Sequence, residues 1–189
     1  MASKRDDILR AALHLYAKKG FHGTTMPELA REAGVGAGTI YRHFDSKEEL
    51  VNTLYRLWKT RITQQVYGDL PHNLPWRERF GLLWRRLLQF AKEHPEGIAF
   101  ADLHFHGDYL DTESRALEQL SAATLFGLVL EGQAAGILVD LPPAVMIAMV
   151  YSCFLGVVRA EWSGYAKIDD ALIAATEERA WAMIRRETP

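Results

Sequence analysis

Four polar side chains gather in a short segment near the amino terminus, and their types suit nucleic-acid binding. They are Thr39, Tyr41, Arg42 and His43. Each can form hydrogen bonds with a phosphate oxygen or the edge of a base. Arg42 is the best candidate for reading sequence, because a guanidinium can pair with guanine through two hydrogen bonds. The small residues at 36–38 would let the backbone approach DNA closely, with the N–H groups of a helix start facing phosphate.

Two short helices joined by a tight turn are predicted to position these residues. Thr25-Met26-Pro27-Glu28 has the form of a capping box with proline in the first turn, so a helix is expected to begin there. Gly34-Val35-Gly36 leaves room only for a turn before a very short helix over about 37–44. That helix is too short to be stable alone. We expect it to pack against the preceding helix and against one that begins near Ser3 and ends at Gly20, which predicts a helix-turn-helix.

A longer pattern of spaced residues surrounds this segment. It comprises Gly20-Phe21, Thr24-Thr25, Leu29-Ala30, Ala33-Gly34-Val35, Gly38-Thr39-Ile40-Tyr41, His43-Phe44, and Lys47 with Leu50. With this pattern, residues 4–55 resemble the DNA-binding segment of the TetR/AcrR family of regulators. The resemblance implies that Thr25, Thr39, Tyr41, His43 and Lys47 contact DNA, and that Ala37 and Arg42 hold variable, sequence-reading positions. The predicted contact set is Thr25, Ala37, Gly38, Thr39, Tyr41, Arg42, His43 and Lys47.

The start of the second short helix departs from the family pattern. Members of the family often carry serine where this chain has Gly36, and a basic or polar residue where it has Ala37. The short side chains remove two possible contacts, so more of the direct readout is left to Thr39 and Arg42. This departure bears on the operator sequence and leaves the prediction of DNA binding unchanged.

Single residues of the segment also have plainer interpretations. Tyr41 and Phe44 alone would be taken as core residues, His43 as a surface histidine, and Lys47 as a solvated charge of the following helix. Phosphate contacts nevertheless account for most hydrogen bonds at protein–DNA interfaces, and these residue types can provide them. The joint pattern therefore favours DNA contact over the separate interpretations.

Charge is divided unevenly along the 189-residue chain, whose net charge is −2. Residues 1–61 carry 11 Lys and Arg against 7 Asp and Glu, whereas residues 62–189 carry 11 against 17. A basic segment followed by an acidic remainder is expected when only the first part meets phosphate. The single cysteine, Cys153, excludes an internal disulfide and fits a reducing cytoplasm. MASKRDD is followed by no apolar run, so no signal peptide is expected.

Helical patterns continue to the carboxyl terminus, and no alternating strand pattern occurs. We predict an all-α protein of nine helices and two domains, with a three-helix DNA-binding domain at 1–50 and a ligand-binding and dimerisation domain at 51–189. A long helix over about 46–67 is expected to link them. The uncharged stretch 141–158 is at the lower length limit of a membrane span. We expect a buried helix there and no membrane partner.

Small residues recur at every fourth position of the helix predicted over 142–164. They are Ala144, Ala148, Ser152, Gly156, Ala160 and Gly164. Such a stripe lets another helix approach closely, from the same chain or from a second copy. The family resemblance implies a four-helix bundle formed by the last two helices of each subunit. We expect a homodimer that binds a palindromic operator, with an interface that includes Ala148, Ser152, Gly156, Ala160, Ala175 and Trp181.

Bulky aromatic residues are concentrated after residue 75, where they could form core or line a cavity. The family resemblance implies a cavity for a small-molecule effector in this region. The candidate lining residues are Phe80, Trp84, Phe100, His104, Phe105, Phe126, Tyr151 and Trp162. Residues 102–108 contain two aspartates and two histidines. Helical residues two apart point in different directions, however, so neither a metal nor another cofactor is expected.

The sequence therefore favours a regulator that a small, largely apolar molecule releases from its operator, most simply a repressor. An activator, a DNA-binding protein without a sensor and a small helical enzyme that uses the cavity are the alternatives. The chain has no Gly-rich phosphate loop and no nucleophile elbow. Cys153 lies in an apolar helix, where a thiol is inert. We therefore expect no enzymatic activity.

Overall fold

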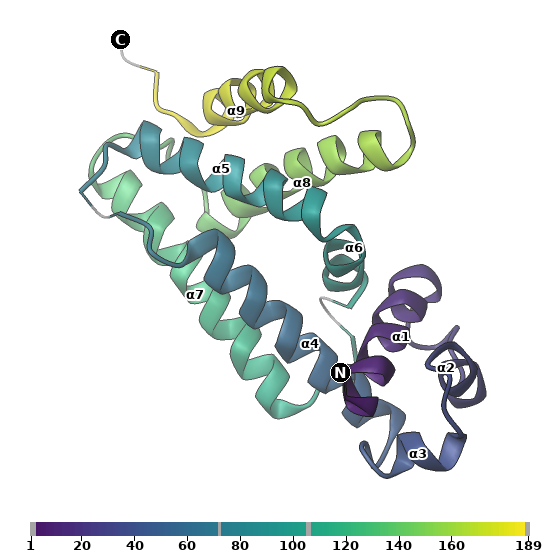
Figure 1. Ribbon diagram of the computed structural model, residues 1–189. Helices are drawn as coiled ribbons and strands as arrows, with labels where there is room; N and C mark the ends of the chain where they lie inside the picture. Colours follow the sequence, from purple (N-terminus) through teal and green to yellow (C-terminus); the bar gives the residue numbers. More distant parts are fainter. Residues whose placement is uncertain (1–2, 72, 105–106, 188–189) are drawn as a thin grey trace. The chain divides into compact units, whose positions relative to one another are not determined.

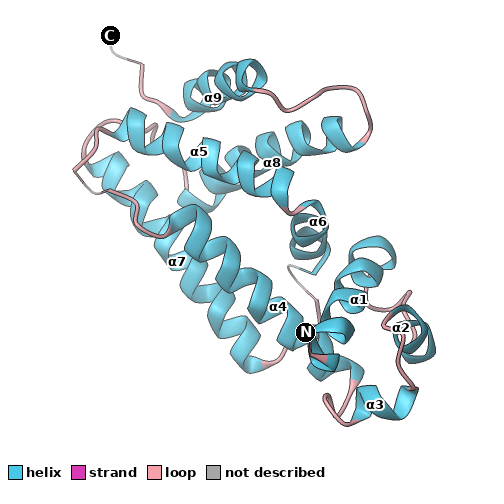
Figure 2. Cartoon of the chain, in the orientation of Figure 1, coloured by secondary structure: helices cyan, strands magenta, loops and turns pink. Residues whose placement is uncertain are grey.

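The computed structural model describes residues 3–71, 73–104 and 107–187 (Figure 1). These residues form nine α-helices and one short π-helical turn, with no strand, as Figure 2 shows. The all-α, nine-helix prediction is confirmed. The chain divides into two compact units, Met1–Ile62 with His94–Glu118, and Thr63–Glu93 with Gln119–Pro189. Each is described by itself.

The first unit is built around the amino-terminal helix. It contains α1 (Lys4–Lys19), α2 (Met26–Glu32), α3 (Ala37–Tyr41), α4 (Lys47–Ile62), α6 (Pro95–His104) and the first turns of α7 (Thr112–Ala134). The side chains of Ser3 and Thr25 cap α1 and α2 in reciprocal capping boxes, of which the one at Thr25 was predicted. Gly34 ends α2 with φ +64°, a left-handed conformation that costs glycine little. Helix α1 packs against α2, α4 and α6.

A single apolar core supports the short helix α3. Within α3 only Ile40 is buried, and Phe44, three residues after the helix, is 1% exposed. The core also includes Ile8 of α1, Leu29 of α2 and Leu50 of α4. Helix α3 ends at Tyr41, earlier than predicted, because the amides of His43 and Phe44 both donate to the carbonyl of Ile40 in a closing turn. Packing, and not length, therefore stabilises α3.

A buried amide fixes the loop before α7 to α4. Asn52 is 2% exposed, and its Nδ2 donates to the carbonyls of Glu48, at 2.8 Å, and Tyr109, at 2.9 Å. Its Oδ1 accepts from the amide of Asp111 at 2.9 Å. Arg56 of α4 pairs with the Asp111 carboxylate at 2.8 Å. These bonds join segments more than fifty residues apart, so the first unit extends well beyond the helix-turn-helix.

The second unit begins where α4 ends. It contains η1 (Thr63–Tyr67), α5 (Trp76–Glu93), the rest of α7, α8 (Pro143–Trp162) and α9 (Asp170–Ile184). The helix predicted over 46–67 is therefore α-helical only to Ile62 and continues as a π-helical turn. Asp169 caps α9 by accepting from the amide of Leu172 at 2.9 Å. The buried core of this unit is Val129, Leu138, Met146, Trp181 and Ile184.

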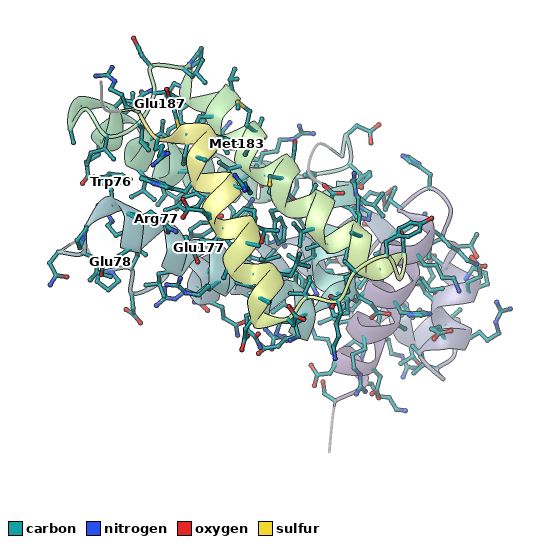
Figure 3. The ribbon with its side chains drawn as sticks, turned by 90° about the horizontal axis from the view of Figure 1, so that it is seen from above. Trp76, Arg77, Glu78, Glu177, Met183 and Glu187 are labelled. Atoms are coloured by element: carbon teal, nitrogen blue, oxygen red, sulfur yellow. The ribbon has the colours of Figure 1, made fainter. Side chains whose placement is uncertain are left out.

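Helices α5 and α9 are joined by charged side chains. Arg77 and Arg85 each donate to a different oxygen of Glu177, both at 2.6 Å, and Glu177 is only 6% exposed. Figure 3 labels Arg77 and Glu177 beside one another on these two helices. Gly81 lies opposite, where an added Cβ would be 2.4 Å from Glu177 Oε1. The absence of a side chain at Gly81 therefore permits this close crossing.

Helix α8 is largely uncovered in the single chain. It is the one helix of the described residues that is long and apolar enough to cross a membrane, and 22% of its most apolar window is buried. Our expectation of a buried helix is therefore wrong for the isolated chain, because only one face of α8 meets the core, through Met146, Phe154, Leu155 and Val158. Its small residues lie mostly on the other face.

The predicted interface residues fall into two groups. Ala148, Ser152, Gly156 and Ala175 are exposed, and Ala160 is half-buried. An added Cβ at Gly156 would meet no atom within 4 Å. Trp181 is instead 7% exposed and belongs to the core of the second unit. The small-residue stripe is therefore open to a second helix, whereas Trp181 faces inward.

Candidate DNA-binding surface and ligand cavity

The predicted DNA contacts lie on the solvent side of α3 and the turns around it. Gly38, Arg42 and His43 are exposed, as is Ala37, and Thr39 is half-buried. Tyr41 is 52% exposed. The interpretation of Tyr41 as a core residue is therefore wrong, and the core position belongs to Phe44. The structure brings these polar groups together on α3 and the turn that follows it.

Nothing inside the chain requires a glycine at the start of α3. Gly36 is its N-cap and makes no side-chain hydrogen bond. A Cβ added at Gly36 or Gly38 would meet nothing within 4 Å, and neither residue has positive φ. Within the helix, glycine at position 38 costs up to about 1 kcal/mol relative to alanine, whereas glycine is a favoured N-cap at position 36. The fold alone does not account for this cost, which indicates a role for the open backbone outside the chain.

Thr25 is exposed, and its side chain also caps the start of α2. Its Oγ1 accepts from the Glu28 amide at 3.4 Å and donates to Glu28 Oε2 at 3.1 Å. Lys19 donates to the same carboxylate at 2.9 Å. The hydrogen bond from Lys19, followed by those from Thr25, lowers the pKa of Glu28 to about 2. Any contact of Thr25 with phosphate would therefore share the hydroxyl with this cap.

Lys47 is held against an aromatic ring. Its Nζ lies 4.1 Å from the ring centroid of Phe21, a cation–π distance. Partial burial lowers the pKa of Lys47. The side chain is half-buried, so it is positioned by the first unit and is not a freely solvated charge.

A cavity of about 150 Å³ lies within the second unit. Its wall is almost entirely apolar and comes from η1, α5, α7, α8 and α9 together with the segments around Leu70 and Leu138. Phe80, Trp84 and Tyr151 of the predicted set line it, as does Trp181. The indole N–H of Trp84 donates to Thr176 Oγ1 at 3.2 Å. The cavity therefore has the composition of a site for an apolar molecule.

The other predicted lining residues lie elsewhere. Phe100 and His104 are buried in the first unit, with ring centroids 6.4 and 5.9 Å from that of Tyr16. Phe126 and Trp162 are 38% and 43% exposed and are not among the described residues of the cavity wall. Phe105 lies outside the described residues. Burial against α1 explains Phe100 and His104, because α6 packs on that helix.

His104 is the centre of a small buried polar cluster. Its Nδ1 contacts the hydroxyl of Tyr109, and its Nε2 lies 3.5 Å from the carbonyl of Tyr16. Burial lowers the pKa of His104 to about 4 and raises that of Tyr109 to about 12. The neutral imidazole fits this network, with Tyr109 donating to Nδ1. Among the described residues no three His, Cys, Asp or Glu side chains gather as a metal site, and His106 lies outside them.

The predicted lining set omits the aliphatic residues of the cavity wall and also Arg79, the one charged side chain among the described residues that line it. Arg79 lines the apolar wall from α5 and is 2% exposed. A signal was present, because Arg79 falls in the helical series Trp76, Arg79, Leu83 and Leu87, all of which line the cavity. A charge within an apolar stripe marks a buried position.

Comparison with known proteins identifies the class. Residues 8–56 match the family described as bacterial regulatory proteins, tetR family, and residues 56–186 match the family described as tetracyclin repressor-like, C-terminal domain. Together these matches cover most of the chain. The chain belongs to the TetR family, and the resemblance seen in the sequence is confirmed.

Individual relatives agree with this assignment. An HTH-type transcriptional regulator of Haemophilus influenzae is 30% identical over 90 residues, which are 48% of each chain. The HTH-type transcriptional repressor KstR2 of Mycolicibacterium smegmatis is 40% identical over 55 residues, 29% of this chain and 27% of that one. The alignments thus span half or less of these curated relatives. A crystal structure from Shewanella sp. PV-4, assigned to the tetR family, has a TM-score of 0.82 and 26% identity and covers 98% of this chain and 100% of the other.

Proposed function

We propose that this chain is the subunit of a homodimeric, cytoplasmic transcription repressor that a small, largely apolar molecule releases from a palindromic operator. The observation that carries the proposal is the exposed polar surface of α3 and the turn after it, where Tyr41, Arg42 and His43 follow a glycine-flanked helix start. TetR-family membership and the basic charge of residues 1–61 support it. The repressor assignment draws on the relative KstR2, which is a repressor.

The uncovered face of α8 supports the dimer. One helix-turn-helix reads about half a site, so a palindromic operator needs two copies, about 34–36 Å apart or a multiple of that. The exposed residues Ala148, Ser152 and Gly156 offer a face on which a second helix can approach closely. Covering this face with a second copy would also remove a large apolar helix from water. Sedimentation of the purified chain as a monomer at micromolar concentration would contradict the proposed dimer.

The cavity of the second unit supports ligand control. A molecule bound there contacts α5, α8 and α9 at once. It can release DNA only if it binds the DNA-free conformation more tightly than the DNA-bound one. The role proposed for the cavity is therefore binding and not catalysis.

The test is DNA selection followed by a salt titration. The purified protein selects duplexes from a random-sequence pool, and we expect an inverted repeat to be enriched. For a protein that makes 6–10 phosphate contacts, affinity should fall about 10³- to 10⁵-fold between about 50 and 200 mM salt. Failure to enrich any repeat, or an affinity that barely responds to salt, would contradict the proposal.

Two variants with the same change in charge sharpen this test. Arg42→Ala should weaken binding to the selected duplex roughly 10- to 100-fold and relax selection at one base pair. Lys167→Ala removes one positive charge from the loop between α8 and α9 and should leave the affinity unchanged. Equal losses in the two variants would mean that only net charge matters.

A further inference from the structure

The guanidinium of Arg79 is buried with part of its hydrogen-bonding capacity unused. The side chain is 3% exposed. Its Nη1 donates to Glu131 Oε1 at 3.2 Å, and its Cζ lies 4.4 Å from the ring centroid of Trp76. Among the described residues, nothing accepts a hydrogen bond from Nε or Nη2. Buried donors without acceptors are costly, and arginine cannot lose its proton to avoid the cost.

The two free nitrogens are the pair suited to a carboxylate. The N–H bonds of Nε and Nη2 lie on the same edge of the guanidinium and point in nearly the same direction. This edge binds the two oxygens of a carboxylate through parallel hydrogen bonds. Glu131 occupies the other end of the group, at Nη1, and its side chain is 56% exposed. A second carboxylate can therefore bind Arg79 without displacing Glu131.

The surroundings of Arg79 restrict the rest of such a ligand. The cavity that Arg79 lines measures about 150 Å³, and its other walls include Phe80, Leu125 and Met146. A cavity of about 150 Å³ lined by apolar side chains can hold a molecule the size of benzene. The site thus combines one fixed cation with an apolar space for a single ring or a short chain.

We propose that the cavity binds a small monocarboxylate whose apolar body fills the space and whose carboxylate pairs with Nε and Nη2 of Arg79. The inference rests on the proposed function, because it specifies the chemistry of the effector. The sequence predicts a largely apolar effector, and this inference adds one negative charge to that molecule. A neutral amide of the same shape offers one acceptor oxygen in place of two and no negative charge, so it would satisfy Arg79 less well.

The test compares benzoate and hexanoate with benzamide and hexanamide, by calorimetry and thermal shift on the full-length protein. We expect each carboxylate to bind on the order of 10- to 100-fold more tightly than its amide, the range for hydrogen bonds to charged groups. Equal affinity of acid and amide, or no binding of either acid, would overturn the inference. DNA binding and its salt dependence, measured on the same preparations, decide the proposed function separately.

Variants of the cavity keep the test specific. Arg79→Met preserves an unbranched side chain and should abolish the preference for the carboxylate while the protein still folds, because the remaining partner, Glu131, is 56% exposed and stays solvated. Arg77→Met removes a neighbouring arginine of α5 that pairs with Glu177 outside the cavity, and should retain the preference. Glu131→Gln should raise carboxylate affinity, because it removes a negative charge next to Arg79. A preference that survives Arg79→Met would assign the carboxylate to another group.

Discussion

The surface of α3 and the cavity of the second unit would recognise their proposed partners in opposite ways. On α3 the recognising groups are exposed, and the helix that presents them is held in place by Ile40 and Phe44. In the cavity the recognising group, Arg79, is buried and almost every neighbour is apolar. Both regions nevertheless contain something that the fold does not need, which is open glycine backbone in one and unpaired donors in the other. Such unsatisfied features indicate where a partner binds.

Among the variants that distinguish the α3 surface from the cavity of the second unit, Phe44→Ala is expected to have the largest effect. Phe44 is 1% exposed and lies directly after α3. Loss of a buried phenyl ring typically costs about 3–5 kcal/mol. Since α3 has few other supports, DNA binding should be lost before the rest of the protein unfolds. Circular dichroism during denaturation and anisotropy with labelled DNA would measure both.

Leu88→Ala is the matched control for this variant. Leu88 is fully buried in α5 and does not line the cavity. Its truncation should cost about 2–5 kcal/mol. DNA binding at low temperature should persist, because α3 is untouched. If DNA affinity fell in proportion to the loss of stability in both variants, the distinction drawn between the α3 surface and the second unit would be wrong.

The next effect concerns pH and the buried cluster of the first unit. The pKa of His104 falls from 6.5 to about 4 on folding, so the unfolded chain binds more protons between these values. Stability should be complete above pH 6.5 and should decline as the pH falls toward 4, by up to about 1.4 kcal/mol per pH unit. Urea denaturation from pH 7.5 to 4 measures this decline. In His104→Gln the slope in this range should be smaller, and an unchanged slope would assign it to other groups.

The smallest effect is expected from Gly38→Ala, with opposite signs for folding and binding. The new methyl group has nothing within 4 Å, so stability should rise by up to about 1 kcal/mol. DNA affinity should fall, because the methyl group would lie between the backbone and the duplex. Gly34→Ala is the control, since its φ of +64° makes any side chain unfavourable and stability should fall. Unchanged DNA affinity in Gly38→Ala would remove the argument from open backbone.

Features that are set by residues adjacent in the sequence could be predicted from the sequence alone. The helix start near Ser3 and the capping box at Thr25 are predicted from local residue types, and the structure has both. The residues of the cavity wall were harder to predict from the sequence, because an aromatic residue has the same helical spacing in a core as beside a cavity. Phe100 and His104 became core only through the packing of α6 on α1, a contact between segments about ninety residues apart. Arg79 is hard to predict as a cavity residue, because a charged side chain on an amphipathic helix is normally solvated.

The π-helical turn η1 opens the second unit and contributes to its cavity wall. The amide of Gly68 donates to the carbonyl of Thr63, five residues back, at 3.0 Å. Val66 and Tyr67, within or at the end of this turn, both line the cavity. Deleting one residue within the turn would rotate the residues that follow by roughly 100° about the helix axis and so carry Val66 and Tyr67 away from the cavity wall. The length of this connector is therefore as important as its composition, and insertions or deletions between 62 and 68 should be tolerated less well than substitutions.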